Sequence, residues 1–190
     1  MEGLILAAGA SSRLGEAKQL LVYQGQSLLE RSIRLAFSVC QGVLVCLGAE
    51  VEQSVRIIEN LQKEFPDLTF VQVENWDKGM GETLAVGLKA VDISRDVLVL
   101  LCDLPFLTTS HLKNLTSLAN PDRAIVASFQ GVNSPPVLIP KALRPLFNHW
   151  SGDQGLGKFW RQNPMLCEIV HFSDKFRDVD VPEDRKYWGI

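Results

Sequence analysis

An apolar run that leads directly into a loop of small residues opens this chain and constrains its fold more than any other feature. The run from Leu4 to Ala8 is continuous rather than alternating, which is typical of a strand buried on both faces. The loop after it is rich in glycine, alanine and serine, and it carries Arg13 and Lys18. Small side chains let a ligand approach the backbone, and free N–H groups with cations bind phosphates. The stretch predicts a nucleoside triphosphate site; an ordinary turn with two solvent-facing cations is the alternative.

The composition is that of an ordinary globular chain. It has 190 residues, 46% hydrophobic and 22% charged, so we expect a single domain over residues 1–190 with a full core. The net charge of −3 indicates no nucleic-acid surface, and no apolar run approaches the roughly 20 residues that span a membrane. The start lacks the basic region of a signal peptide, and the four cysteines match no zinc or redox spacing. We therefore expect a cytoplasmic protein with reduced cysteines.

Strand and helix patterns alternate along the chain. Strands are expected over residues 4–8, 42–48, 68–73, 97–102, 124–128, 137–139 and 167–171. Helices are expected after Ser27 and over residues 50–64, 84–91, 108–119, 140–147 and 157–162, with a final turn after Pro182. Continuous apolar strands separated by helices predict an α/β fold with a mostly parallel sheet covered on both faces.

A single aspartate, Asp103, directly follows the apolar strand over residues 97–102. The carboxyl ends of parallel strands meet at one edge of the sheet, so Asp103 and the first loop are expected to share a cleft. Mg²⁺ prefers one or two carboxylates together with phosphate oxygens and water. The position predicts a magnesium ligand; because Pro105 follows closely, an aspartate that caps a turn is the alternative.

Three further patterns are weaker. Asp178 and Asp180 would lie on one side of a short strand, as a second metal ligand or as a solvated acidic strand. Gly79-Met-Gly81 would allow close backbone approach to a ligand, or would form a flexible turn. The run from Gly152 to Lys158 fits most of a Walker A loop, but phenylalanine stands where a hydroxyl residue is needed and no apolar strand precedes it. No Gly-x-Gly-x-x-Gly follows a strand.

Together these motifs resemble the MobA-like nucleotidyltransferases, and within them most closely the molybdenum cofactor cytidylyltransferases. The resemblance rests on Leu6-Ala-Ala-Gly-Ala-Ser-Ser-Arg13 with Lys18, Gly79-Met-Gly-Glu-Thr-Leu, Cys102-Asp-Leu-Pro105 and Asp180-Val-Pro-Glu-Asp184. It covers nearly the whole chain. It implies a Rossmann-like three-layer α/β/α sandwich of the nucleotide-diphospho-sugar transferase type, and a Mg²⁺-dependent transfer reaction.

The resemblance also implies roles for individual residues. Arg13, Lys18 and Asp103 would be catalytic, and Asp103 with Asp180 would hold Mg²⁺. The nucleotide would contact Leu6, Ala7, Ala8, Gly9, Ser11, Ser12, Arg13, Lys18, Gly79 and Gly81. Ser134 and Asp153 would face the acceptor, in two regions where this chain departs from the cytidylyltransferase pattern. Those enzymes commonly have Gly-His-Pro-Val where this chain has Ser134-Pro-Pro-Val137, and an arginine that is missing from the run 152–157.

The expected reaction is transfer of CMP from CTP to a molybdopterin-type cofactor with release of pyrophosphate, and the product would pass to a molybdoenzyme. The form Leu-Ala-Ala-Gly, with Ala8, resembles the cytidine-using branch more than the guanine-using one. A sugar phosphate or another phosphorylated metabolite is an alternative acceptor. A catalytically silent nucleotide-binding or cofactor-delivery protein is the alternative from a different class. No nucleic-acid or membrane partner is expected.

Overall fold

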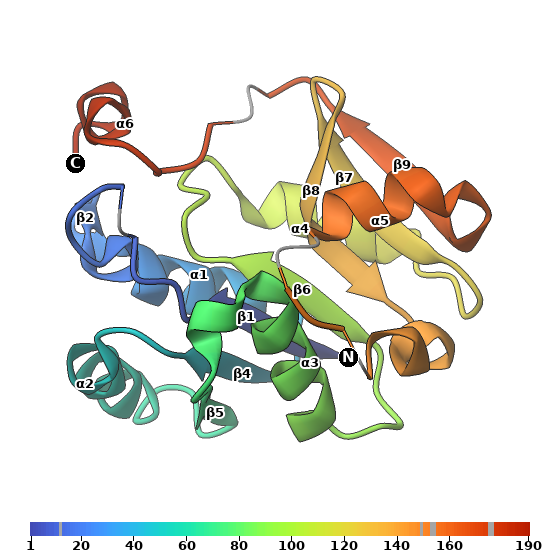
Figure 1. Ribbon diagram of the computed structural model, residues 1–190, viewed down its shortest axis with the longest axis horizontal. Coiled ribbons are helices and arrows are strands. Elements are labelled where there is room, and N and C mark those ends of the chain that lie inside the picture. Colours follow the sequence, from blue (N-terminus) through green and yellow to red (C-terminus); the bar gives the residue numbers. More distant parts are fainter. Residues whose placement is uncertain (12, 149, 153–154, 175–176) are drawn as a thin grey trace.

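A seven-stranded sheet forms the centre of the computed structural model, which describes residues 1–190 except 12, 149, 153–154 and 175–176 (Figure 1). In spatial order its strands are β5 (Leu68–Gln72), β4 (Gly42–Leu47), β1 (Glu2–Ala7), β6 (Val97–Leu101), β8 (Val132–Ile139), β7 (Ala124–Phe129) and β9 (Cys167–Phe172). Only β8 runs against its neighbours, β6 and β7. The expected mostly parallel sheet is confirmed.

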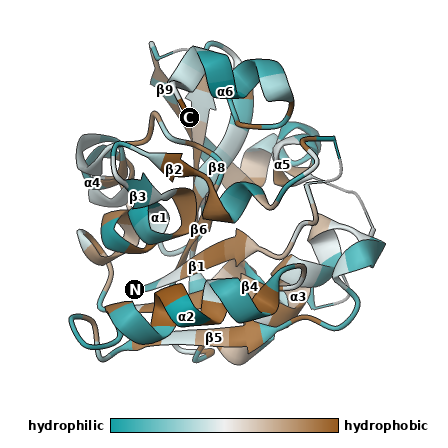
Figure 2. Cartoon of the chain, turned by 90° about the vertical axis from the view of Figure 1, so that its left-hand side faces the viewer, coloured by the Kyte–Doolittle hydropathy of each residue, from teal (hydrophilic) through white to brown (hydrophobic). Residues whose placement is uncertain are grey.

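Helices cover both faces of this sheet. The helices on one face are α1 (Leu28–Phe37), α2 (Val51–Leu61) and α4 (Thr109–Ser117); those on the other are α3 (Met80–Ala90) and α5 (Leu156–Gln162). Alternate strand residues supply two cores, so that in β1 Ile5 packs toward α1 whereas Leu4 packs toward α3. Figure 2 shows the apolar strands inside and the polar helix faces outside. This is the predicted three-layer sandwich. No helix in the described part of the chain is long and apolar enough to cross a membrane.

The antiparallel strand differs most from its expected bounds. The sequence predicts a strand only over residues 137–139, but β8 begins at Val132. Gln130 and Gly131 both have positive φ, at 50° and 86°, and form the tight turn that pairs β8 with β7. A register shift between Val126 and Ala127 lets the proline-containing part of β8 stay in the sheet.

Two other elements also differ from expectation. The segment 140–147 forms a 3₁₀ helix, Lys141–Phe147, which contains Pro145 and ends near it. The final turn after Pro182 is a helix, α6 (Pro182–Trp188), whose first position suits the fixed φ of proline. Ser27 caps α1 as predicted, because its hydroxyl accepts the N–H of Glu30 at 3.1 Å.

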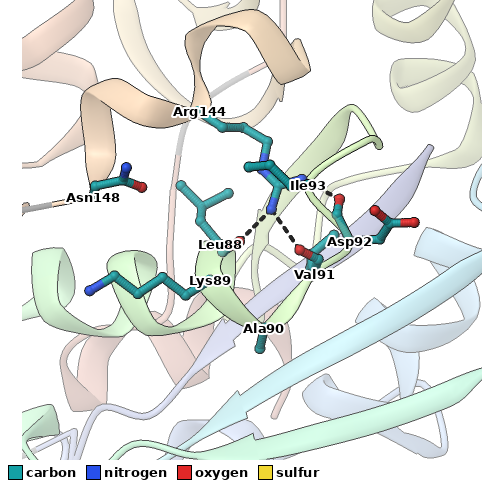
Figure 3. A pocket seen from close by; sticks show the side chains of 8 residues that line it. All are labelled: Leu88, Lys89, Ala90, Val91, Asp92, Ile93, Arg144 and Asn148. Carbon is teal, nitrogen blue, oxygen red and sulfur yellow. Dashed lines mark hydrogen bonds between the residues drawn. The ribbon is translucent and has the colours of Figure 1, made fainter.

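A buried arginine, Arg144, fastens the carboxyl end of α3 (Figure 3). Its guanidinium donates to the carbonyl oxygens of Leu88 and Asp92, to Val91 at 2.8 Å and to Arg95 at 3.0 Å. The last carbonyls of a helix have no partner within the helix, and a charged donor satisfies them strongly. Because the helix is rigid, this anchor also restrains its amino end, next to the predicted ligand-binding turn at Gly79.

We expect Arg144→Met to lower the free energy of unfolding by about 3 kcal/mol, because two buried and two partly buried carbonyls lose a charged donor. Urea unfolding followed by circular dichroism measures the change. Lys141→Met is the matched control, since Lys141 is exposed and its change should stay within about 0.5 kcal/mol. Equal stability of the two variants would contradict the role given to Arg144.

Candidate active site

A cavity of about 410 Å³ lies at the carboxyl ends of β1 and β6. Its walls come from the loop after β1, the 3₁₀ turns Lys18–Leu20 and Trp76–Lys78, and the start of α3. Most of the residues that the sequence assigned to the nucleotide line it: Leu6, Ala7, Ala8, Gly9, Ser11, Arg13, Lys18 and Gly79. Asp103, which the sequence assigned to the metal, lines it as well. The topology therefore brings the first loop and Asp103 together, as the parallel sheet predicts.

Lys18 and Asp103 form a largely buried ion pair in this cavity. The ammonium Nζ lies 2.6 Å from Asp103 Oδ2, and the backbone N–H of Lys18 donates to Ser11 Oγ at 3.1 Å. Burial opposes the charge of Lys18, but the neighbouring Asp103 carboxylate outweighs this effect and raises the pKa of Lys18. The side chain of Lys18 is only 18% exposed, whereas that of Arg13 is 73% exposed. The alternative of an ordinary turn with two solvent-facing cations therefore does not hold for Lys18, which pairs with Asp103.

Asp180 joins this pair from the far end of the chain. Its carboxylate lies 2.5 Å from Arg13 Nη1 and 3.6 Å from Lys18 Nζ. The backbone N–H of Val179 donates to the carbonyl oxygen of Asp103 at 3.0 Å and holds the segment in place. The strand predicted here is absent among the described residues 177–181, because Val179 makes only this one backbone contact with the core. Val179 is buried between the half-buried Asp178 and Asp180, as the alternation predicts, but Val181 is half-buried too.

A third carboxylate, Asp178, lies near the other two. Burial raises the pKa of Asp178, and the negative charges of Asp103 and Asp180 add to the shift. The cations of the first loop thus face a concentration of negative charge. Two cations, Arg13 and Lys18, lie among three carboxylates, those of Asp103, Asp178 and Asp180.

The side chains of the site suit a divalent cation that is bound partly by the protein and partly by the phosphates of a bound ligand. Asp103 Oδ1 is buried and has no hydrogen-bond partner among the described residues, so one carboxylate oxygen is left for a further cation. Within the described residues, no group of three or more histidine, cysteine or acidic side chains could hold a metal alone. Mg²⁺ commonly takes only one or two protein carboxylates and completes its shell with phosphate oxygens and water. Asp103, with Asp180 beside it, matches that donor set.

The two glycines at the start of α3, Gly79 at its N-cap and Gly81 in its first turn, have different structural roles. Gly79 lines the cavity and has φ of 111°, a conformation that strongly favours glycine. Gly81 does not line the cavity: its N–H donates to the Gly152 carbonyl at 3.0 Å. A Cβ at Gly81 would lie 2.5 Å from a ring carbon of Trp150, so this glycine is explained by packing.

Besides Gly81 and Asp180, three predicted site residues do not line the cavity or lie outside the described residues. Ser134 is buried in β8 and does not line the cavity. Ser12 and Asp153 lie outside the described residues. The acceptor side of the site therefore remains a prediction.

Sequence reasoning missed several cavity residues. Gln19 is buried and donates to the Ala49 carbonyl at 3.3 Å, while Trp76 lies against Gly48. A Cβ at Gly48 would lie 2.5 Å from both Trp76 and the Ala8 carbonyl oxygen. A glycine that ends an apolar strand was the available signal of such a close approach.

We expect the Lys18–Asp103 pair to be coupled by about 1 to 3 kcal/mol in a double-mutant cycle of Lys18→Met and Asp103→Asn. The pair is buried, so each single variant leaves an unpaired partner. Urea unfolding at pH 7 measures the coupling. The exposed Arg123–Glu168 pair, 3.2 Å apart, is the control and should be coupled by less than about 1 kcal/mol. Equal coupling in both pairs would contradict the geometry described for Lys18.

Comparison with known proteins agrees with this architecture. Nicotine blue oxidoreductase of Paenarthrobacter nicotinovorans is 33% identical over 189 residues, covering 94% of this chain and 90% of that protein. Molybdenum cofactor cytidylyltransferase of Escherichia coli (strain K12) is 26% identical over 187 residues, covering 95% and 91%. A nucleotidyl transferase from Methanothermobacter thermautotroptrophicus has the same fold, with a TM-score of 0.79, 16% identity and coverage of 98% and 94%.

Residues 3–166, which include the first loop, Gly79 and Asp103, match the model of the MobA-like NTP transferase domain. The resemblance drawn from the motifs is thereby confirmed at the level of the family. The chain belongs to the MobA-like NTP transferase family of nucleotidyltransferases.

Proposed function

We propose that residues 1–190 form a single Mg²⁺-dependent nucleotidyltransferase domain that transfers CMP from CTP to a molybdopterin-type cofactor and releases pyrophosphate. The observation that carries the proposal is the meeting of Arg13, Lys18 and Asp103 at one cavity. An acceptor phosphate attacks the α-phosphate of the triphosphate, the new P–O–P bond forms, and the bond to pyrophosphate breaks. This chemistry needs positioning and charge neutralisation more than covalent help.

Each charged side chain has a role in this proposal. Arg13 and Lys18 neutralise the phosphates, and Asp103 with Asp180 holds Mg²⁺, which when bound supplies positive charge beside the phosphate oxygens. Arg13 is the more exposed cation and is free to turn from Asp180 toward a phosphate. Lys18 is already at the cavity wall and needs to move little. The small residues from Ala7 to Ser11 admit the nucleotide to the backbone.

Two observations support CTP and a molybdopterin-type acceptor as the substrates. The Escherichia coli relative is a molybdenum cofactor cytidylyltransferase, and Ala8 lines the cavity where a base would lie close to the backbone. Ser134 and Asp153 are proposed to face the acceptor, and a molybdoenzyme is the proposed recipient of the product. A sugar phosphate or another phosphorylated metabolite is the alternative acceptor, and a silent cofactor-delivery protein is the alternative without turnover.

The deciding experiment is pyrophosphate release with CTP, GTP, ATP and UTP, each tested with molybdopterin-type cofactor and with a set of sugar phosphates. We expect turnover with CTP, Mg²⁺ and the molybdopterin-type acceptor. Nucleotide binding without turnover on any acceptor would favour the delivery protein. Because one relative is named an oxidoreductase, oxidation of a reduced nicotinamide cofactor is assayed in parallel; such activity without pyrophosphate release would overturn the proposal.

We expect Asp103→Ala to abolish most turnover, since loss of a metal ligand removes several kcal/mol of transition-state stabilisation. Arg13→Ala should lower kcat/KM by roughly a hundredfold, the usual scale for one preorganised charge donor. Its thermal stability should hardly change, because Arg13 is exposed. Lys18→Ala should lower kcat/KM by a similar factor. It should also lower the thermal stability, because Asp103 then loses its buried partner. Near-normal activity of Asp103→Ala would remove that residue from the metal site.

We expect a preference for CTP over GTP that Ala8→Gly relaxes. A purine needs more room than a pyrimidine, and the methyl group of Ala8 limits the space beside the cavity wall. Steric discrimination of this kind is worth about 1 to 3 kcal/mol. The measurement is kcat/KM for both triphosphates with one acceptor, in the original chain and in the variant. An unchanged ratio would show that Ala8 does not select the base.

A further inference from the structure

The C-terminal segment, residues 177–190, returns from β9 to the first loop and lies beyond the residues that match the family model. In Figure 1, α6 lies beside β2 (Val22–Tyr23) at the blue end of the chain. Val179 is buried in a small apolar cluster with Leu14, Leu21 and Leu28. Trp188 packs edge-on to the ring of Tyr23, with centroids 6.0 Å apart. The segment is thus fastened to the loop that carries Arg13 and Lys18.

Within this segment the carboxylate of Asp184 holds the backbone at the start of α6. Its Oδ2 accepts the N–H groups of Asp180 and Val181, each at 3.0 Å, and its Oδ1 accepts Arg177 Nε at 3.0 Å. The side chain of Asp184 is only 11% exposed. Burial works against its charge, but the two N–H groups and the guanidinium outweigh burial and lower the pKa of Asp184. Both oxygens of the carboxylate are therefore engaged by hydrogen-bond donors.

One of the N–H groups that Asp184 accepts belongs to Asp180, the residue whose carboxylate contacts Arg13 and Lys18. Because one carboxylate oxygen binds two successive N–H groups, the peptide between Asp180 and Val181 cannot rotate without breaking a charged hydrogen bond. On the other side, the N–H of Val179 is held by the Asp103 carbonyl oxygen. The backbone at Asp180 is thus fixed from both sides, with its carboxylate toward Arg13 and Lys18.

We propose that Asp184 is a positioning residue of the nucleotidyl-transfer site, which acts by setting Asp180 against Arg13 and Lys18. The inference rests on the proposed function, because it gives Asp180 a place in binding the nucleotide and its metal. Asp184 itself does not line the cavity. A helix cap with no effect beyond stability is the competing explanation, and the two differ in whether Asp184 acts through Asp180.

The test measures the Kd of CTP with Mg²⁺ by calorimetry, together with thermal stability. We expect Asp184→Ala to weaken binding at least tenfold and Asp184→Asn, which keeps an oxygen acceptor, to weaken it less. In an Asp180→Ala background, Asp184→Ala should change Kd less than twofold, because the residue through which it acts is gone. Asp96→Ala is the matched control: Asp96 also accepts a backbone N–H at a helix start, that of Lys141 at 2.9 Å. Its Kd should stay unchanged.

Three results would overturn the inference. One is unchanged Kd in both Asp184 variants, and another is an equal effect of Asp184→Ala with and without Asp180. If Asp184→Ala does not fold, Asp184→Asn decides alone. Failure of the proposed function is recognised separately, as absence of binding of any triphosphate to the original chain. The effect of Asp184 on Asp180 is then measured without nucleotide, from the ¹³C chemical shift of the Asp180 carboxyl carbon. This shift should change in Asp184→Asn and stay unchanged in Asp96→Ala. An unchanged shift in Asp184→Asn is the third overturning result.

Discussion

The ion pair between Lys18 and Asp103 is the contact on which the arrangement of the site depends. It joins residues 85 positions apart, one after β1 and one after β6. The two strands are neighbours in register, with Leu6 opposite Leu101, so their carboxyl ends lie side by side. A buried charge is costly without its partner. Each charge is therefore satisfied only when both strands are in place, and the pair links the site to the centre of the sheet.

Asp180 extends this pair into a network of three chain segments. It contacts the exposed Arg13 and the buried Lys18, and it is delivered by a segment that forms no sheet. In the proposed function Arg13 and Lys18 would pair with the phosphates of the triphosphate, while Asp103 and Asp180 would hold the metal ion. Each charged side chain would then keep a partner of opposite sign. This gives a physical reason why the site combines opposite charges rather than only phosphate-binding cations.

Backbone packing, rather than side-chain chemistry, shapes the walls of the cavity. Gly48 lets the Ala8 carbonyl and Trp76 lie close together, and Gly79 allows the turn into α3. Gly81 is bound to the loop at Gly152, so α3 is held at its amino end, while Arg144 holds its carboxyl end. The helix is thereby fixed at both ends relative to the loop that it faces across the cavity.

The sequence by itself determined the class of fold and the family, and it predicted that the first loop and Asp103 share one cleft. These follow from local patterns: continuous apolar strands, small residues beside cations, and a carboxylate at a strand end. It left the direction of β8 undecided, because pairing across Gln130-Gly131 depends on register rather than on composition. Only the tertiary structure decided that Lys18 is largely buried and that Asp184 holds the backbone of Asp180. These contacts join side chains and backbone groups of segments that meet only in the folded chain. Local patterns predict that strand ends meet at one edge of the sheet, but not which atoms there become buried or hydrogen-bonded.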